Sequence, residues 1–554
     1  MEKYEKEEKQ IKIFVNQIGY DLNGSKFAYA TGTCDNGFFG VRNVETNQIV
    51  FSAKACEPVV DRVAGEPVVC FDFSSICDAG KYQIVFSKSD NFEASSDSAG
   101  FAAESFSFVI DSKIYDDLFY STLNYFYLSR CGQDIDGGDW SHPACHTAPA
   151  LIYGTDIKKN VTGGWHDAGD YGRYVVAGAK AVMDLLLAYE QCKNSFTGFD
   201  ILSEVRFELE WMLQLQREDG AVFHKISCYH FCGFINPQDE KDELVLSPIS
   251  TTATADFAGV CAFASSFFKR SDSAFAKKLM NAALKAQKYL DSHDDELFKN
   301  PPEITTGGYG DWTASDERYF ALAALFEQTG DEKYLNKAME IRLAVMNAPK
   351  NPDMPWINGW SEGFGWGMVS GYGTIIFLRN QDKISDKAIV KSLYDSMLKK
   401  ADDVLKRVDN AAFGTSIEKV FWGSNGHVCD DAHAFFAAYE LTGKKEYYEA
   451  AKKQFDYLLG CNPNNICYIT GFGTNTVQYP HHRPSGAVGK TVPGMLAGGP
   501  CEGLLDAVAK EKLGPLNLPP LKCYIDHVGS YSTNEVAIYW NSSFVYLVAM
   551  LKLV

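Results

Sequence analysis

The stretch that decides the fold is ALFEQTG at residues 324–330, and a related stretch, AYELTG, stands at residues 438–443. In both copies Thr-Gly closes an apolar run, a Tyr stands four residues after the Gly and an Ala eight residues after it. A glycine at the end of a helix can adopt the left-handed conformation that stops the helix, and two helices joined by a tight turn form an antiparallel pair. Because each pair can bury its apolar face only against neighbouring pairs, the repeat predicts a closed ring of helical hairpins.

Helical spacing of apolar residues extends outward from these two copies over most of the chain after Tyr115. It predicts helices at residues 203–216, 256–268, 273–292, 316–328, 332–346, 385–408, 431–441, 446–459 and 535–553. Long loops that carry glycine and tryptophan interrupt them at residues 130–170, 218–252, 299–315, 351–372 and 460–530. Because function tends to reside on such loops, we expect the site there.

The first hundred residues follow a different pattern. Short alternating segments separated by Gly, Asn and Asp, such as IKIFVN at residues 11–16 and KYQIVF at residues 81–86, predict the strands of a small β-sandwich. We therefore expect a charged tail at residues 1–10, a β-sandwich domain at residues 11–111 and a mainly α domain at residues 112–554.

Composition excludes several classes of partner. The 554 residues are too many for one ordinary core, and 71 acidic against 52 basic residues give a net charge of −19. Because there is no basic excess, we expect no nucleic acid and no anionic membrane as partner. The charged start of the chain lacks the apolar segment of a secretory signal, so we expect a secreted protein if a leader was trimmed away and a cytoplasmic one otherwise. Fifteen scattered cysteines do not suit a disulfide scaffold.

Three carboxylates in two distant segments point to a reaction. Asp167 and Asp170 lie on the segment GGWHDAGD at residues 163–170, where two close carboxylates can hold a water between them. Glu535 opens the last predicted helix, a strongly apolar one. Hydrolysis of a glycosidic bond with inversion needs a base that activates water and an acid that protonates the leaving oxygen. We predict Asp170 as the base, Asp167 as its helper and Glu535 as the acid. A helix cap or calcium ligands, and an ordinary first-turn Glu, are the alternatives.

Side chains that can hold sugars lie on the same loops. Aromatic faces pack on the apolar faces of pyranose rings, and the aromatic candidates are Tyr309, Trp312, Trp356, Trp360, Trp366 and Trp422. His481 and Arg483 can donate hydrogen bonds to sugar hydroxyls or tune a carboxylate. The alternatives are partly packed tryptophans and a surface loop held by arginine–carboxylate pairs.

Two cysteines and two histidines form a candidate zinc site, because two thiolates and two imidazoles suit a closed tetrahedral site. These residues are Cys131, Cys145, His146 and His166. The alternative is a pair of buried free thiols beside stacking histidines. His166 would join the metal to the loop of Asp167 and Asp170, so that loss of zinc would loosen the base. A second group is equally well explained by a β-hairpin with alternating residues: His224, Cys228, His230 and Cys232.

These motifs resemble those of glycoside hydrolase family 9 over residues 112–554. WHDAGD at residues 165–170 resembles the family's catalytic aspartate motif. The family's C-terminal acidic signature is matched at Tyr524, Asp526, Tyr531, Glu535, Ala537, Asn541 and Ser542. Its histidine signature is matched at Gly473, Asn475, Pro480, His481 and Arg483. Cys467 departs from that signature, because Ser, Thr or Val is usual there. VNQIGY at residues 15–20 resembles the start of the immunoglobulin-like domain that precedes the catalytic domain in one branch of the family.

The resemblance implies an (α/α)6 barrel, inversion of configuration and a β-1,4-glucan or cello-oligosaccharide substrate. It implies the three roles given above for the carboxylates, a subsite at the cleaved bond lined by His481 and Arg483, and Tyr531 beside the acid. It also implies the structural zinc and a structural calcium whose ligands the sequence does not place.

We expect an endo-β-1,4-glucanase, a cellulase. The alternatives are an exo-acting cellodextrinase or exo-β-glucosaminidase on the same barrel, and a catalytically silent glycan-binding protein. A closed cleft end would favour exo action, and the loops at residues 130–160 and 228–245 are the candidates for closing it.

Overall fold

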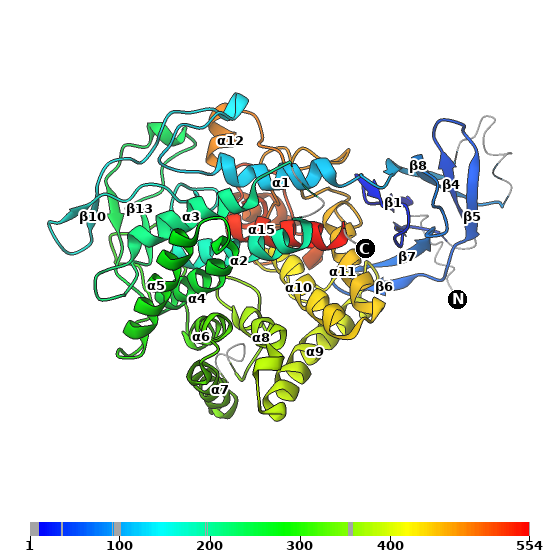
Figure 1. Ribbon diagram of the computed structural model, residues 1–554. Coiled ribbons are helices and arrows are strands. Elements are labelled where there is room, and N and C mark those ends of the chain that lie inside the picture. Colours follow the sequence, from blue (N-terminus) through cyan, green and yellow to red (C-terminus); the bar gives the residue numbers. More distant parts are fainter. Residues whose placement is uncertain are drawn as a thin grey trace.

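The computed structural model describes residues 10–34, 37–90, 92, 101–193, 196, 198–352 and 358–552. The first nine residues of the predicted N-terminal tail, and Trp356, lie outside these ranges. A β-rich unit lies beside a larger helical body (Figure 1).

The N-terminal unit contains nine strands within the described residues. They are β1 (Lys12–Phe14), β2 (Gly19–Tyr20), β3 (Phe27–Thr31), β4 (Phe38–Asn43), β5 (Ile49–Lys54), β6 (Val59–Asp61), β7 (Glu66–Asp72), β8 (Gly80–Ser87) and β9 (Ala103–Ile110). They form two sheets, β1-β3-β7-β6 and β2-β9-β8-β4-β5. Phe39 of one sheet packs on Phe71 of the other, with ring centroids 5.1 Å apart. The predicted β-rich domain is therefore confirmed.

The helical body begins with α1. Its helices are α1 (Asp116–Leu128), α2 (Val175–Cys192), α3 (Ile201–Leu215), α4 (Thr251–Phe268), α5 (Ser273–Leu290), α6 (Ser315–Thr329), α7 (Glu332–Asn347), α8 (Ser370–Arg379), α9 (Lys387–Asn410), α10 (Ser424–Thr442), α11 (Lys445–Leu458), α12 (Arg483–Val488), α13 (Ala507–Leu513), α14 (Tyr531–Asn534) and α15 (Ile538–Leu551). In the part of the chain that the structure describes, no helix is both long and apolar enough to cross a membrane.

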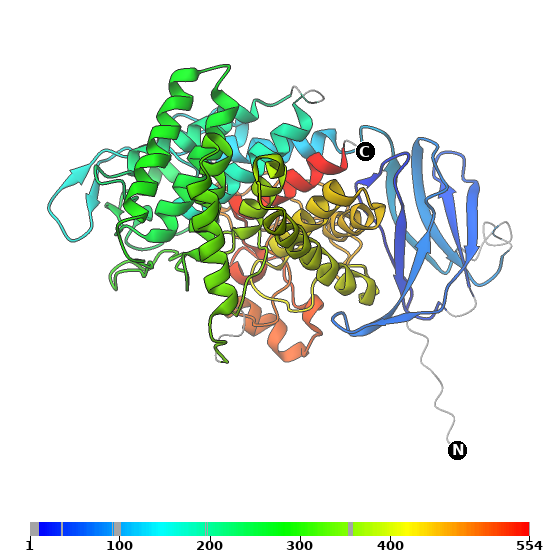
Figure 2. The ribbon, with the colours of Figure 1, turned by 60° about the horizontal axis from the view of Figure 1, so that its bottom comes forward.

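The helices divide into an inner and an outer set. The inner helices α2, α4, α6, α8, α10 and α15 are buried on most of their surface, and each packs against the next, with α15 returning to α2. The outer helices α3, α5, α7, α9 and α11 each pack along an inner partner and bury one face. Figures 1 and 2 show α15 in the middle of the body, beside α2 and α10. A helix that is apolar all round belongs inside, whereas an amphipathic helix covers it.

Both copies of the Thr-Gly repeat end a helix as predicted. Gly330 and Gly443 take the left-handed conformation, with φ of 67° and 69°, directly after α6 and α10. The helix predicted at residues 535–553 was wrong at its start. Glu535 has extended backbone between the short α14 and α15, and α15 begins only at Ile538.

A small sheet that the sequence prediction missed lies beside the helices. It joins β10 (Ala150–Ile152), β11 (Lys158–Lys159), β12 (Arg173–Tyr174), β13 (Lys225–Cys228) and β14 (Leu244–Leu246) in the order β11-β10-β14-β13-β12. β12 directly follows the segment of Asp167 and Asp170. The sheet therefore fixes where the end of that segment lies in the fold.

The N-terminal unit is hydrogen-bonded to a loop of the helical body through Gln17. Its Oε1 accepts hydrogen bonds from the backbone N–H groups of Thr474 (3.0 Å) and Asn475 (2.8 Å), and its Nε2 donates to the Asn465 carbonyl (3.0 Å). The loop that Gln17 holds runs on towards His481.

Candidate active site

The segment of Asp167 and Asp170 is shaped by its glycines. Gly163 and Gly164 have φ of 96° and 79°, and a Cβ on Gly164 would come within 2.5 Å of the Trp211 ring. Only glycine allows both this conformation and this close approach. The turn is further fixed because the N–H of Asp167 donates to the Gly172 carbonyl at 2.9 Å.

Asp167 is a buried carboxylate held on one side. Its Oδ2 accepts a hydrogen bond from Tyr309 at 2.5 Å, while its Oδ1 has no hydrogen-bond partner among the described residues. Tyr309 holds this position with φ of 49°, a conformation that is rare for a non-glycine residue. Burial raises the pKa of the Asp167 carboxyl well above its ordinary value, the charge of Asp170 raises it further, and the Tyr309 hydrogen bond lowers it.

Asp170 lies next to a buried tyrosine and a buried lysine. Its Oδ2 accepts hydrogen bonds from the Gly172 N–H (3.1 Å) and the Tyr174 hydroxyl (3.2 Å). The Lys225 ammonium lies over the Tyr174 ring, 5.4 Å from its centroid. Burial lowers the pKa of Lys225 to about 7, against the raising effect of the Asp170 charge. Sequence inspection missed Lys225, because a single Lys at the start of a strand carries no signal.

Three distant segments meet at Gly169. A Cβ there would lie 2.3 Å from the His481 carbonyl oxygen and 3.1 Å from Glu535 Oε1. The Gly169 carbonyl accepts hydrogen bonds from the Arg483 backbone N–H (3.1 Å) and from Arg483 Nη1 (2.6 Å). Gly169 therefore brings the aspartate segment, the histidine loop and Glu535 together, and its lack of a side chain makes the approach possible.

The surroundings of Glu535 favour its neutral form. Burial raises the pKa of the Glu535 carboxyl well above its ordinary value, and the charges of Asp170 and Asp167 raise it further. The Arg483 charge and a hydrogen bond from the Gly169 N–H lower it. A carboxyl group that its surroundings hold in the neutral form is what a general acid needs.

His481 and Arg483 are held by backbone carbonyls. His481 Nδ1 lies 2.6 Å from the Val528 carbonyl, and Arg483 Nε donates to the Cys232 carbonyl at 3.0 Å. Arg483 thus links the aspartate segment to the chain around Cys232.

The acidic signature is held together by Asp526. Its carboxylate accepts hydrogen bonds from the N–H groups of Gln478 (2.6 Å) and Tyr479 (2.8 Å) and from Asn534 Nδ2 (2.8 Å). It therefore fixes the histidine loop to the residue that precedes Glu535.

The predicted aromatic residues are in unlike surroundings. Tyr531 packs on Trp422 with ring centroids 5.2 Å apart. Trp312 is 63% exposed. Trp360 donates to Glu362 at 3.0 Å and packs on Tyr319, which fixes it against α6 and α9. Tyr309 is surrounded by three rings whose centroids lie 4.6 to 5.7 Å from its own: Tyr174, Trp366 and Tyr539.

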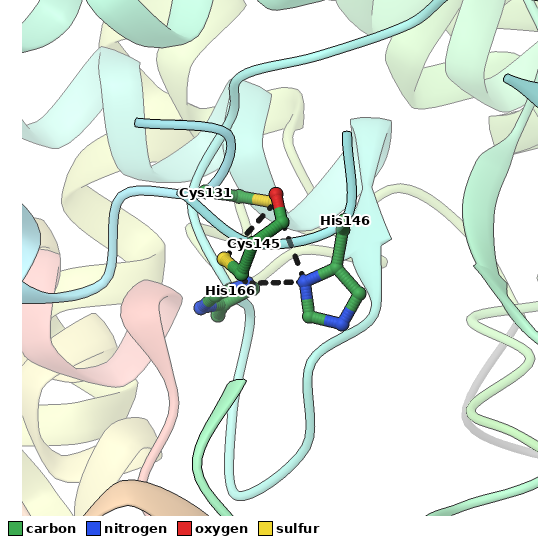
Figure 3. A group of neighbouring side chains, drawn as sticks. All are labelled: Cys131, Cys145, His146 and His166. Atoms are coloured by element: carbon green, nitrogen blue, oxygen red, sulfur yellow. Dashed lines mark hydrogen bonds between the residues drawn. The ribbon is translucent and has the colours of Figure 1, made fainter. Parts of the chain in front are cut away.

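The two cysteines and two histidines of the candidate metal site converge (Figure 3). One ligand atom from each of these buried residues lies within 4.8 Å of the other three: Cys131, Cys145, His146 and His166. It is the only such group among the described residues. The Nε2 atom of His146 pairs with Glu240 at 2.9 Å, the kind of carboxylate contact that orients a metal-binding histidine.

The spacing of these ligand atoms fits a tetrahedron. A zinc ion about 2.3 Å from sulfur and about 2.0 Å from nitrogen keeps its ligands about 3.8 Å (S–S), about 3.5 Å (S–N) and about 3.3 Å (N–N) apart. The two sulfur atoms are 3.9 Å apart, two sulfur–nitrogen pairs are 3.6 and 3.7 Å apart, and the two nitrogen atoms are 3.4 Å apart. The residues therefore form a candidate metal site.

The second cysteine–histidine group does not converge in this way. His224 is buried, lies 2.8 Å from the Ser250 hydroxyl through Nδ1 and stacks on Phe298 at 3.8 Å. Cys228 ends β13, and His230 Nδ1 contacts the Thr305 hydroxyl at 2.9 Å.

Comparison with known proteins agrees with this geometry. The family model described as Glycosyl hydrolase family 9 matches residues 115–548, and the one described as Cellulase N-terminal ig-like domain matches residues 8–91. A cellodextrinase of Butyrivibrio fibrisolvens is 35% identical over 560 residues, which cover 97% of this chain and 98% of that protein.

Two solved structures are similar over nearly the whole chain. A thermostable endoglucanase of Alicyclobacillus acidocaldarius is 33% identical with a TM-score of 0.86, over 98% of this chain and 99% of that one. A zinc-binding triple mutant of a family 9 endoglucanase is 26% identical with a TM-score of 0.86, over 96% of this chain and 99% of that one. The chain therefore belongs to glycosyl hydrolase family 9 and carries the ig-like domain of cellulases before its catalytic region.

Proposed function

We propose that this protein hydrolyses β-1,4-glucosidic bonds of cellulose-derived chains with inversion of configuration. The observation that carries the proposal is the meeting at Gly169, which sets the Glu535 carboxyl beside the segment of Asp170. Asp170 acts as the base that takes a proton from water, and Glu535 as the acid that protonates the leaving oxygen. Asp167 holds the water through its free Oδ1, in the place that Tyr309 fixes.

The substrate lies along the rings and donors at the mouth of the site. Tyr309 and Tyr531 lie beside Asp167 and Glu535, and His481 borders Gly169. Trp312 is exposed enough to stack on a sugar, whereas Trp360 supports the loop from behind. The choice between internal cleavage, expected from the sequence, and terminal cleavage depends on the walls of the cleft and not on the carboxylates.

The architecture proposed for the helical body is the (α/α)6 barrel, preceded by an immunoglobulin-like domain, with the boundary at residue 111. The succession of inner helices from α2 to α15 and back supports the barrel, and the change from β9 to α1 supports the boundary.

Zinc is the metal proposed for the cysteine–histidine site. The ligand spacing and the zinc-binding relative support it. Bound there, zinc would hold the chain of residues 131–146 to His166 and so stiffen the segment of the aspartates. A calcium ion is best placed where buried Asp256 and Glu317 have no hydrogen-bond partner for any carboxylate oxygen among the described residues, beside Asp316 and Asp311.

The proposal is tested by proton NMR of the full chain with cellopentaose, following the anomeric signals from the first turnovers. We expect the α-anomer of the new reducing end to appear first. Initial β-anomer would overturn inversion, and no turnover with cello-oligosaccharides but turnover with glucosamine oligomers would overturn the substrate.

A further inference from the structure

We propose that residues 229–240, here named the end wall, close the cleft beside Asp170, so that the protein removes short fragments from the non-reducing ends of β-1,4-glucan chains. The inference rests on the proposed inverting hydrolysis and adds which bond of the chain is cut.

The small sheet places the end wall at the level of the base. β12 and β13 are antiparallel, with Arg173 opposite Ile226. The chain running back from Arg173 to Asp170 and the chain running on from Ile226 to Tyr229 therefore leave the two strands at the same end of the pair. The connection from β13 to β14 occupies residues 229–243, far more than the roughly two to five residues usual for a hairpin.

The end wall is fixed at both of its sides. On one side the Tyr229 carbonyl accepts a hydrogen bond from the Thr305 N–H at 2.8 Å, and His230 Nδ1 contacts the Thr305 hydroxyl. On the other side the Phe234 ring meets the His481 ring edge-on at 5.2 Å. A Cβ on Gly486 would come within 2.7 Å of Phe234. The end wall thus crosses from the loop of Tyr309 to the loop of His481.

Further contacts hold the end wall against residues 163–171, here named the base segment because they carry Asp170. The Tyr171 hydroxyl donates to the Ile235 carbonyl at 2.6 Å. Arg483 donates to the Cys232 carbonyl, and its guanidinium lies 5.3 Å from the Phe231 ring centroid and 5.8 Å from that of Phe234. Because Arg483 also holds Gly169, base segment and end wall form one braced unit.

A small pocket lies between the end wall and the base. Its lining includes Asp170, Thr306 and Arg483 from the site and His230, Phe231 and Cys232 from the end wall. Phe231 is 49% exposed and stands at the mouth of the pocket. A sugar beside Asp170 therefore meets the end wall directly.

The opposite side of the site carries a row of rings. The row leads from the end wall through Phe234, His481, Tyr531 and Trp422, each in contact with the next. Trp422 is 43% exposed, so the row reaches the surface. In the proposed arrangement the closed end of the site lies beside Asp170 and the open end beyond Glu535.

This asymmetry sets the direction of the substrate. Water attacks the anomeric carbon, which belongs to the sugar on the non-reducing side of the cleaved bond, and the acid protonates the oxygen that leaves with the sugar on the reducing side. The base therefore lies against the sugar on the non-reducing side, and the acid lies beside the leaving chain. A wall beside the base limits how many sugars fit before the cleaved bond, whereas the open side accepts chains of any length.

The test uses the full chain with cellopentaose and cellohexaose, each labelled at its reducing end, and early products are identified by mass spectrometry. We expect an unlabelled fragment of the same length from both substrates and a labelled remainder that is one sugar longer from cellohexaose. The viscosity of carboxymethylcellulose should fall little per bond cleaved. Early products of several lengths with a steep fall in viscosity would overturn the inference while leaving inversion intact. So would a labelled fragment of the same length from both substrates with an unlabelled remainder one sugar longer from cellohexaose.

A loop variant tests the cause. Residues 231–235 replaced by Gly-Ser-Gly-Ser-Gly keep both ends of the end wall, and we expect products of several lengths and a severalfold larger fall in viscosity per bond. Phe231→Ala is the milder version, with Tyr120→Ala, an exposed aromatic on α1, as its control. A folded loop variant that still releases one length would overturn the role of the end wall. If that variant does not fold, the label position in the wild-type products decides the question.

Discussion

At the scale of single residues, Tyr309 is the side chain that holds Asp167, the carboxylate proposed to position the water. Its hydroxyl is the hydrogen-bond partner of Asp167 Oδ2, and its unusual backbone conformation aims it there. We expect Tyr309→Phe to lower kcat roughly 10- to 100-fold, because a hydrogen bond to a charged group contributes about 1.5–3 kcal/mol. KM should change little. Steady-state kinetics on cellopentaose measure both.

The matched control for this change is Tyr153→Phe, which removes another tyrosine–carboxylate hydrogen bond, to Glu303, on the surface. It should leave kcat unchanged. An equal loss in both variants would mean that Tyr309 acts through stability alone.

We expect the raised pKa of Glu535 to set the alkaline limit of activity. An acid works only while protonated, so kcat/KM should fall as the pH rises through this pKa, which burial and the charges of Asp170 and Asp167 hold above the ordinary value. Glu535→Gln should lose about 10²- to 10⁴-fold on cellopentaose. It should lose far less on an aryl cellobioside whose leaving group needs no proton.

Asp170→Asn is the comparison for the same pair of substrates, because a base is needed whatever the leaving group. It should lose activity on both. If Glu535→Gln also loses activity equally on both, the assignment of the acid is wrong.

The sequence alone could predict the residues that lie in motifs. Asp167, Asp170 and Glu535 are each ordinary alone, and they stood out through the glycine-rich segment around the aspartates and the match of both segments to the family's motifs. The sequence could not predict that Tyr174 and Lys225 lie in the site, because their place there depends on contacts between segments that the fold brings together. The role of Trp360 as a subsite residue stays a prediction, and its indole N–H donates to Glu362.

At the scale of elements, the helical spacing of apolar residues predicted the outer helices and missed some of the inner ones. α5, α7, α9 and α11 have one apolar face and lie within a few residues of their predicted bounds. α2 is buried along nearly its whole length, so no polar face marks its period, and it was not predicted. The strands β10, β11, β12 and β14 have two or three residues each, too few to show alternation, whereas β13 lies in the stretch that the sequence could explain as a β-hairpin.

We expect the candidate metal site, once it holds its metal, to support the segment of Asp167 and Asp170. We expect Cys145→Ser to lower the thermal midpoint by at least about 5 °C, because a structural metal contributes its binding free energy to folding. Activity should fall with it. Differential scanning calorimetry, activity and metal content by mass spectrometry are the measurements, on protein before and after chelation.

Cys467→Ser is the control, since it changes another buried cysteine outside the metal site. Its midpoint should stay close to that of the wild type, with and without chelator. Full activity and an unchanged midpoint after complete removal of metal would contradict the proposed support.

At the scale of the whole molecule, we expect the N-terminal domain to help to shape the site. Gln17 holds the loop that leads to His481 by three hydrogen bonds. We expect Gln17→Ala to lower kcat several-fold, and residues 112–554 alone to be less stable and less active than the full chain. Kinetics and thermal unfolding of both proteins measure this.

Gln48→Ala, at an exposed position between β4 and β5, is the control for the side-chain truncation. If residues 112–554 fold and work as well as the full chain, the N-terminal domain has no part in shaping the site.

The central place of α15 has a consequence for folding during synthesis of the protein. α15 packs between α2 and α10 and is made last, about 360 residues after α2. At roughly 5–20 residues per second, translation takes on the order of 20–70 s to cover that distance. Over that time, the apolar side of α2 that α15 covers in the folded protein is not yet covered by α15. Nascent chains of this protein should therefore be long-lived clients of chaperones that bind exposed apolar helices.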